Sequence, residues 1–536
     1  MDMGLIRQTF KKFYVLFLAV FLIGAHVNVA QADDNTLIVA VTHDLSNMDP
    51  TLASGDTVVW EVLTNVYDWL IDYAVVNETT GKRFGHPDLF VGALADHFVW
   101  SNDGHTLTFH IRKGLKFSNG DPLDAEAVKF TFDRIYDQGG VTVGNMALSE
   151  VPTKDHVRMI DSHTIEMTLD RANGMIFGNM AQLGNAILNP KVVKPHMTAD
   201  DPYAHEWLAN NTQGTEQGPY RMESWDIGNQ WVLVRNEHYN REPAKLERII
   251  FKVIPDASSR LAQLVSGAVD IAKDIPTIDI KSVENNPDIT IVRNPTRMLG
   301  YLGMSADFPP FDNVKVRQAV SYAIPYETII NDVLNGYAIP MKSPLPVGTP
   351  THSAEFNQYK HDPEKAKALL AEAGFPNGFK TTLEIPVGSQ EAKETAMYVQ
   401  QSLAEVGVDI DIVELPGAAY FGKIQQHELG FYFANFWISI NNDPMYHFYW
   451  KFLHACCNYT DTKNDRVNEL IEQWTVTTDL AGREKASLEI QKILVDEAAW
   501  VYLYHPEQII AMRSNVKGHV FYPADVITRY KYLYKD

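Results

Sequence analysis

Strand-like and helix-like patterns alternate along the whole chain, and this alternation limits the possible folds more than any other feature. Thr106–Arg112 alternates between apolar and polar residues, which is the period of a half-buried strand. Asp124 stands at the capping position before a segment whose apolar residues recur at helical spacing. Asp362–Gly374 has a capping aspartate, a proline at the first helical position and a terminal glycine. These patterns predict a mixed α/β protein.

No stretch of the sequence has the composition of a flexible linker between independent domains. The chain has 536 residues, which is long for a single hydrophobic core and favours two or three folding units. Even the proline-rich segment Pro340–Pro350 is predicted to be an ordered loop. We therefore expect lobes between which the chain crosses several times, rather than domains strung in a row.

The N-terminus has the three parts of a secretory signal. Basic residues at positions 7, 11 and 12 precede the apolar stretch Phe13–Gly24, and Ala30–Ala32 forms an A-Q-A cleavage site. The alternative is a membrane anchor, but the apolar stretch covers only about 12 residues and a bilayer span needs about 20. We predict a signal peptide of residues 1–32 that is cleaved after Ala32, and a mature protein outside the cytoplasm.

The chain is strongly acidic, with a formal net charge of −21. Binding to nucleic acid requires clustered lysine and arginine residues, so no nucleic-acid partner is expected. The charge could attract a cationic ligand, or it could simply keep an exported protein soluble, and solubility is the more economical interpretation.

The two cysteines, Cys456 and Cys457, are adjacent in the sequence. Neighbouring Cα atoms lie about 3.8 Å apart, below the roughly 4.4–6.8 Å range of ordinary disulfides. We therefore predict two free, partly buried thiols, with a vicinal disulfide lining a pocket as the alternative. Neither arrangement has the spacing of a metal site.

The sequence contains none of the common enzyme motifs: there is no G-x-S-x-G, P-loop, G-x-G-x-x-G, H-E-x-x-H or C-x-x-C pattern. Its 18 histidines are scattered without the spacing of metal ligands. We expect no enzymatic activity, no cofactor and no bound metal. A secreted hydrolase stays open as an alternative, because catalytic triads assemble from distant positions.

Aromatic residues are concentrated between Tyr420 and Tyr459. Aromatic side chains provide a large contact area at low entropic cost, and a few polar groups can then orient a ligand. Most of these rings are expected to belong to the core. For Trp437 and the polar residues that follow it, a binding site and an ordinary core position are equally compatible with the pattern.

Several segments resemble the bacterial extracellular solute-binding proteins, family 5, of peptide and nickel ABC importers. IRKGLKFSNG is similar to the family's LRKGVKFSDG, and PFDNVKVRQA is similar to PFDDVRVRQAL. The segments run in the family's order across nearly the whole mature chain, and they are Ile111–Gly120, Gly218–Tyr220, Arg235–Tyr239, Ser266–Asp270, Pro310–Ala319 and Asp362–Gly378.

The resemblance implies a type II periplasmic-binding fold with two hinged lobes and an inserted extra domain. Residues 33–75, 186–292 and 506–536 would form the first lobe, residues 76–185 the inserted domain, and residues 293–505 the second lobe. Two strands crossing between the lobes would form the hinge. The implied function is that of a monomeric periplasmic component of an ABC importer, which captures a peptide or peptide-like solute and delivers it to an inner-membrane permease.

The resemblance also suggests ligand-binding residues. The loop Ser54-Gly55-Asp56 would offer backbone hydrogen bonds, and Trp437 would stack on the ligand. Arg297 could pair with a ligand carboxylate. The remaining candidates are Met298, Tyr420, Ile440, Asn441 and Asp443.

One of these positions departs from the family pattern. Trp437 and Asp443-Pro444 match the family's WxxDxxDP, but the aspartate that holds the ligand's α-ammonium in peptide-binding relatives is replaced by Ile440. An ammonium beside Ile440 would be buried without a partner unless Asp56 or Asp443 substituted. An opine-like conjugate, an oligosaccharide or a nickel complex therefore stays open beside a peptide.

Overall fold

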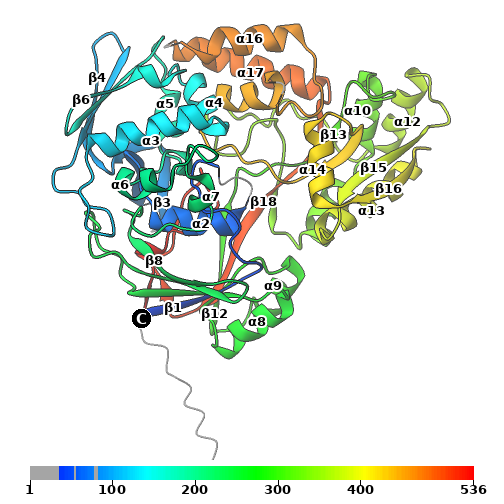
Figure 1. Ribbon diagram of the computed structural model, residues 1–536. Helices are drawn as coiled ribbons and strands as arrows, with labels where there is room; N and C mark the ends of the chain where they lie inside the picture. The colour runs from blue at the N-terminus through cyan, green and yellow to red at the C-terminus, as the bar shows by residue number, and fades with distance from the viewer. Residues whose placement is uncertain (1–34, 53–55, 78–81, 455, 478) are drawn as a thin grey trace, which may run out of the picture.

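The computed structural model describes residues 35–536, apart from residues 53–55, 78–81, 455 and 478, and it is a mixed α/β protein (Figure 1). The predicted signal peptide lies outside the described residues. Within the described part of the chain, no helix has both the length and the apolar character needed to cross a membrane. The predicted strand Thr106–Arg112 is confirmed as β5 (Thr106–Ile111).

The predicted helix caps are also confirmed. The side chain of Asp124 accepts a hydrogen bond from the first turn of α3 (Ala125–Gln138), and Asp362 does the same for α12 (Pro363–Glu372). Both helices begin where an acidic side chain satisfies backbone N–H groups that have no partner within the helix.

One sheet runs through both halves of the molecule. Ten of its 12 strands follow the order β16-β15-β17-β13-β18-β11-β1-β10-β9-β8, and β12 and β14 pair with β18 beside this path. In that order, the strands are Asp409–Leu415, Lys380–Pro386, Phe431–Ala434, Gly300–Met304, Trp500–Arg513, Ile271–Ala272, Thr36–Val41, Arg248–Val253, Gln230–Arg235 and Tyr220–Asp226, with β12 at Ile289–Pro295 and β14 at Ala338–Pro340.

The long strand β18 joins the two halves of this sheet. Its beginning pairs with β13, with Trp500 opposite Gly303, whereas its end pairs antiparallel with β12 and β11. We call the part around β1 and β8–β11 the first lobe, and the part around β13 and β15–β17 the second lobe. The boundaries predicted at 292/293 and 505/506 fall inside β12 and β18, because the chain changes lobe along strands that are already paired.

The helices cover the two lobes separately (Figure 1). Those of the first lobe are α2 (Thr57–Val66), α6 (Pro190–Val193), α7 (His205–Leu208), α8 (Ala257–Ser266) and α9 (Thr277–Val283). Those of the second lobe are α10 (Val314–Ala323), α11 (Tyr326–Thr328), α12, α13 (Gln390–Ala404), α14 (Gly417–Gln425), α15 (Pro444–Phe448), α16 (Asp465–Thr475) and α17 (Leu480–Asp496).

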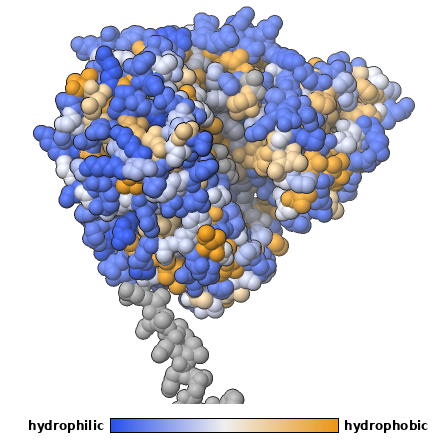
Figure 2. All heavy atoms as spheres, viewed as in Figure 1, coloured by the Kyte–Doolittle hydropathy of each residue, from blue (hydrophilic) through white to orange (hydrophobic). Residues whose placement is uncertain are grey.

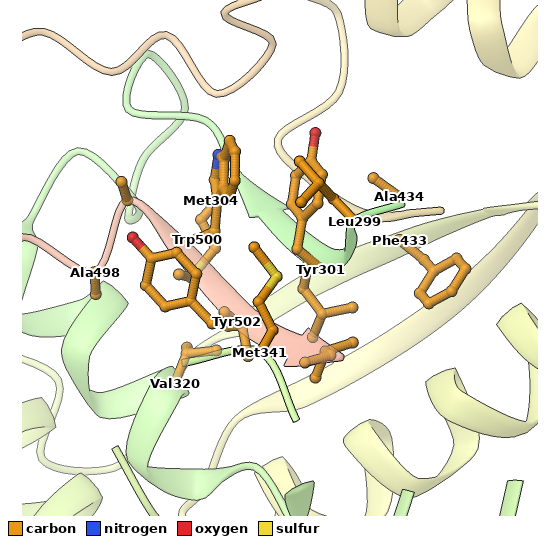
Figure 3. Close-up of a cluster of buried hydrophobic side chains, with 14 of the residues drawn as sticks. Leu299, Tyr301, Met304, Val320, Met341, Phe433, Ala434, Ala498, Trp500 and Tyr502 are labelled. Carbon is orange, nitrogen blue, oxygen red and sulfur yellow. The ribbon is translucent and has the colours of Figure 1, made fainter. Parts of the chain in front are cut away.

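Each lobe has its own buried core. The core of the second lobe is drawn from chain positions between Leu299 and Tyr504, with additions from Leu148 and Met175 of the inserted domain. Figure 3 shows part of it, including Tyr301 and Trp500. The rings of these two residues are stacked, with their centroids 4.4 Å apart. The main core of the first lobe combines early residues with residues near the C-terminus, such as Tyr530. The C-terminal chain therefore returns to the first lobe.

We keep the name inserted domain for residues 76–185, the range predicted from the sequence, and the described part of this range contains a four-stranded antiparallel sheet covered by helices. Its strand order is β4 (Ala95–Trp100), β5, β7 (Thr164–Thr168) and β6 (Val157–Asp161). Its helices are α3, α4 (Val141–Leu148) and α5 (Met175–Met180). A separate three-stranded sheet, β2-β3-β20, uses Ile71–Asn77, Arg83–Gly92 and Val520–Phe521, while β19 (Val516–Lys517) pairs with β21 (Tyr534–Lys535).

The prediction of two free thiols was wrong. Cys456 and Cys457 form a disulfide although their Cα atoms lie only 3.8 Å apart. The preference of disulfides for wider spacing is a trend among bridges between distant residues, and the turn between α15 and α16 accommodates this pair. Neither cysteine is among the residues that line the two cavities described below.

Candidate functional site

A cavity of about 790 Å³ lies between the two lobes, and we call it the cleft. On the face shown in Figure 2, a deep groove separates the lobes. The first lobe contributes the start of α2 and Lys273–Ile278, which leads into α9. The second lobe contributes Thr296, Met298 and Gly388–Glu391, and the β18 segment Pro506–Ile510 lies across the boundary. The cleft is thus formed by elements that meet only in the folded molecule.

Most of the charged groups on the cleft walls are carboxylates. Lys273 is the one lysine or arginine among the described lining residues, and its ammonium pairs with Glu61 at 2.6 Å. Glu507 is paired with Arg293 at 2.5 Å. The other lining carboxylates form no ion pair among the described residues, and they are Asp274, Asp332, Glu391 and Glu394. The walls therefore carry negative charge that the protein itself does not neutralise.

Glu391 occupies the most enclosed position of these carboxylates. Ser389 caps α13, and this cap places Glu391 in the first turn of the helix, facing the cleft. Its Oε1 accepts hydrogen bonds from Asn435 Nδ2 and Tyr504 OH, each at 2.7 Å. Burial raises the pKa of the Glu391 carboxyl above its ordinary value. The side chain is held in place by neutral donors, and no described cation balances its charge.

A second cavity, of about 580 Å³, lies between the inserted domain and the second lobe, and we call it the side cavity. Phe90, Phe98 and Phe177 from the inserted domain form one wall. On the other wall, Asp443 pairs with Arg483 at 2.6 Å. The side cavity therefore has an aromatic wall and one internal ion pair, while its other lining carboxylates, Asp88 and Glu484, form no ion pair among the described residues.

Arg297 connects the second lobe to the inserted domain. Its Nη2 donates to Asn442 Oδ1 at 2.5 Å, and the Asn442 amide donates to both oxygens of Asp88, at 2.7 and 2.8 Å. Arg297 is 2% exposed, its Nη1 has no hydrogen-bond partner among the described residues, and burial lowers its pKa to about 10. Arg297 thus remains a cation at neutral pH, and its guanidinium is directed toward Asn442, which in turn binds Asp88.

The structure places the candidate residues of the first lobe and the crossing segment as follows. Ser54 and Gly55 lie outside the described residues. Asp56 caps α2 and accepts further hydrogen bonds from Ser46 and His43, so its carboxylate is already engaged. Met298 lines the cleft.

The aromatic candidates lie apart from both cavities. Tyr420 is fully buried, and its hydroxyl donates to the Phe433 carbonyl. The ring of Trp437 has the ammonium of Lys451 over it, 5.4 Å from the ring centroid. Burial lowers the pKa of Lys451 to about 7. Neither Tyr420 nor Trp437 is among the residues lining the cleft or the side cavity.

The segment after Trp437 contacts the inserted domain. The Ile440 carbonyl accepts a hydrogen bond from Gln182 Nε2 at 3.0 Å. Asn441 Nδ2 donates to the Met175 carbonyl at 3.0 Å, and Asn441 lines the side cavity together with Asp443. The ligand contacts expected of these residues stay predictions.

Sequence reasoning missed most of the residues that line the cleft, Glu391 and Asn435 among them. The sequence offered one usable signal, since Ser389 predicts a helix start and so places Glu391 in the first turn of that helix. Nothing local to Asn435 pointed to Glu391, which is 44 positions away. Among the described residues, no group of three or more potential metal ligands comes together.

Comparison with known proteins adds family information to this geometry. Residues 90–458 match the family described as "Bacterial extracellular solute-binding proteins, family 5 Middle". The chain is 30% identical to the probable D,D-dipeptide-binding periplasmic protein DdpA of Escherichia coli (strain K12), covering 92% of this chain and 93% of the relative. It is 27% identical to heme-binding protein A of Haemophilus influenzae, covering 93% and 92%.

A solved structure extends the comparison to the fold. The periplasmic binding protein DppA from Helicobacter pylori, in complex with the peptide STSA, matches with a TM-score of 0.79 and 25% identity, covering 93% of this chain and 98% of that one. The predicted α/β fold of the type II periplasmic-binding class is confirmed by this likeness.

Proposed function

The chain belongs to the bacterial extracellular solute-binding proteins, family 5, and we propose that it captures a peptide or peptide-like solute in the cleft and delivers it to an ABC permease in the inner membrane. The observation that carries the proposal is the cleft itself. The cleft is a large cavity between two lobes that have separate cores. The main chain crosses from one lobe to the other along β12 and β18.

The geometry suits capture by closure. Because residues from both lobes line one cavity, a ligand there contacts both walls at once, and only such contacts favour the closed arrangement over the open one. The chain crosses between the lobes along β12 and β18, and bending of these segments can accommodate a rotation of one lobe against the other. The permease would then recognise the closed form.

Native mass spectrometry of protein purified without dialysis is the direct test. We expect a retained solute of peptide size, whose mass and fragmentation give its class. A sugar, an opine-like conjugate or a nickel complex would replace the peptide assignment while leaving the carrier function in place. Conversion of added peptides into hydrolysis products would contradict the carrier function itself.

Export and assembly state are part of the same proposal. Removal of residues 1–32 would leave Asp33 as the first residue, which the intact mass of protein recovered from the periplasm measures. The protein is proposed to act as a monomer, and light scattering coupled to size-exclusion chromatography tests this. A mass that retains the first 32 residues, or a stable dimer, would contradict these two points.

The role of Arg297 toward a ligand carboxylate also remains a proposal. Thr296 and Met298 line the cleft, whereas Arg297 binds Asn442. To separate a ligand contact from the structural contact with Asn442, the affinities of the free-acid and C-terminally amidated forms of one peptide are measured for the unmodified protein and for the Arg297→Met variant. Only a carboxylate contact makes the variant lose its preference for the free acid.

A further inference from the structure

Two oxygen atoms in the cleft wall lack a donor. Oε1 of Glu391 accepts both of that side chain's hydrogen bonds, and among the described residues nothing donates to Oε2. The neighbouring Asn435 Oδ1 is buried and also accepts no hydrogen bond from described groups. Both residues line the cleft. Because Asn435 Oδ1 is buried, the acceptor left for a ligand is the second carboxylate oxygen of Glu391, which suits a ligand that donates hydrogen bonds.

We propose that the cleft binds a positively charged group of its ligand, an ammonium or a guanidinium, and that Glu391 pairs with it. This inference rests on the proposed carrier function and specifies the chemistry of its ligand. It also locates the charge partner that Ile440 cannot supply, away from the position used in peptide-binding relatives.

The surrounding charges favour a cation over an anion. Glu394 lies one helical turn beyond Glu391, and Asp332 stands on the same lobe, each without an ion pair among the described residues. The ammonium of Lys273 is already engaged by Glu61 at 2.6 Å and by the Thr528 hydroxyl at 3.0 Å. An anionic ligand would have to approach several uncompensated carboxylates, whereas a cation would neutralise one of them.

The alternatives for the ammonium partner are already occupied. Asp56 is a helix cap with additional donors, and Asp443 is bound by Arg483 and caps α15. Releasing either carboxylate would leave helix N–H groups or a guanidinium unpaired. Glu391 needs no such release, because its hydrogen bonds to Asn435 and Tyr504 use the other oxygen.

The test uses matched peptides that differ in one charge. The pairs are Ala-Ala with N-acetyl-Ala-Ala, Ala-Lys with Ala-Nε-acetyl-Lys, and Ala-Arg with Ala-citrulline, titrated by calorimetry into mature protein stripped of retained ligand. We expect the charged member of at least one pair to bind about tenfold or more tightly than its neutral partner, which is the scale of one charge-assisted contact. The Glu391→Gln variant should reduce this preference to less than about threefold.

Two further variants keep the test specific. Glu391→Gln retains the acceptor oxygen for Asn435 and Tyr504, so its melting temperature should stay close to that of the unmodified protein. Glu391→Asp keeps the charge and should restore part of the preference. Glu405→Gln removes an exposed carboxylate from the end of the same helix and should leave the preference unchanged.

Each remaining outcome decides against the inference. Tight binding of the neutral peptides, or an undiminished charge preference in Glu391→Gln, would overturn it and leave the carrier function standing. Absence of binding by every peptide in the set would overturn the proposed peptide-class function, and the inference would fall with it.

Discussion

The cleft and the side cavity lie on opposite sides of the crossing segment Thr296–Met298, which connects β12 to β13, and their charged groups have different partners. In the cleft, carboxylates such as Glu391 stand without a cation from the described protein. In the side cavity, Arg483 neutralises Asp443 at 2.6 Å, and three phenylalanine rings line much of the other wall. Its other two carboxylates form no ion pair among the described residues: Asp88 accepts both of its hydrogen bonds from the Asn442 amide, and Glu484 is exposed. A charge that a protein neutralises itself serves its own stability, whereas an uncompensated charge in a cavity indicates that a ligand provides the partner.

The crossing segment explains why the two sides differ. Successive residues of an extended chain point to opposite faces, so Thr296 and Met298 line the cleft while Arg297 binds Asn442 on the other side. The segment's one buried cation is therefore turned away from the cleft. The cleft keeps its negative character although an arginine is next to it in sequence.

The largest expected effect comes from filling each cavity in turn. Thr57→Trp places an indole at the exposed start of α2, inside the cleft, and should weaken binding of the tightest charged peptide by about 100-fold, or about 2.7 kcal/mol. Leu89→Trp, at a position 49% exposed on the side cavity, should change affinity by less than about threefold. Calorimetry on both variants measures the difference, and equal losses would mean that the ligand extends into the side cavity.

Breaking the internal ion pair of the side cavity should affect stability instead of binding. Asp443→Asn leaves the largely buried Arg483 without its counter-charge, and we expect a loss of about 2 kcal/mol in the free energy of unfolding. The matched control is Glu372→Gln, which breaks the exposed pair with Lys315 and should cost less than about 0.5 kcal/mol. Urea unfolding compares the two, and a similar loss in both variants would argue against a special role for the buried pair.

His505 on β18 should make the stability of the region where the chain crosses between the lobes depend on pH. Its Nδ1 lies 2.9 Å from the Met298 carbonyl, and burial lowers its pKa to about 4. An unfolded histidine has a pKa of about 6.5, so the neutral, buried His505 contributes its full share to the free energy of unfolding above that pH. This contribution is lost as the pH falls toward 4, because the unfolded chain then binds a proton that the folded protein does not. Between pH 8 and pH 5, the free energy of unfolding should fall by about 1–2 kcal/mol more in the unmodified protein than in His505→Asn.

Thermal unfolding of both proteins across that pH range provides the measurement. The asparagine amide can still donate to the Met298 carbonyl, so the variant separates proton uptake from the loss of the hydrogen bond. Parallel pH profiles would show that His505 is not the group that takes up the proton.

The smallest effect is expected from the carboxylate that we assign to the ligand. Because burial raises the pKa of Glu391 in the folded state, its contribution to stability is greatest below the unfolded value of about 4.3 and is lost as the pH rises through the folded value. In the absence of ligand, Glu391→Gln should therefore be more stable than the unmodified protein near pH 8, by on the order of 0.5 kcal/mol, and equal to it near pH 4.

Scanning calorimetry on ligand-free protein resolves such a difference. A variant that is less stable at every pH would mean that Glu391 supports the fold through Tyr504 and Asn435, and the contrast between the two cavities would lose its sharpest example.

Much of the fold followed from local patterns. Asp124 and Asp362 predicted their helices because a capping side chain acts on N–H groups only two or three residues away. Thr106–Arg112 predicted a strand because its period of two reflects one buried and one open face. The pairing of Cys456 with Cys457 was missed, since a general preference for wider spacing does not describe one particular turn.

The binding residues were predicted less well, and for a physical reason. Sequence similarity pointed to Asp56, Trp437 and Asp443, yet hydrogen bonds and ion pairs with other parts of the chain engage both aspartates. Whether a carboxylate is available depends on which groups fold against it. That information is spread over positions far apart in the sequence.

The sequence by itself determined the order of strands and helices, their caps and the family, because these depend on residues within a few positions of one another. Only the tertiary structure decided which charges are neutralised and which face the cleft. Glu391 meets Tyr504 across 113 positions, and Arg297 turns to Asn442 across 145. Electrostatic partners are set by distance in space, which a chain acquires only when its distant segments pack together.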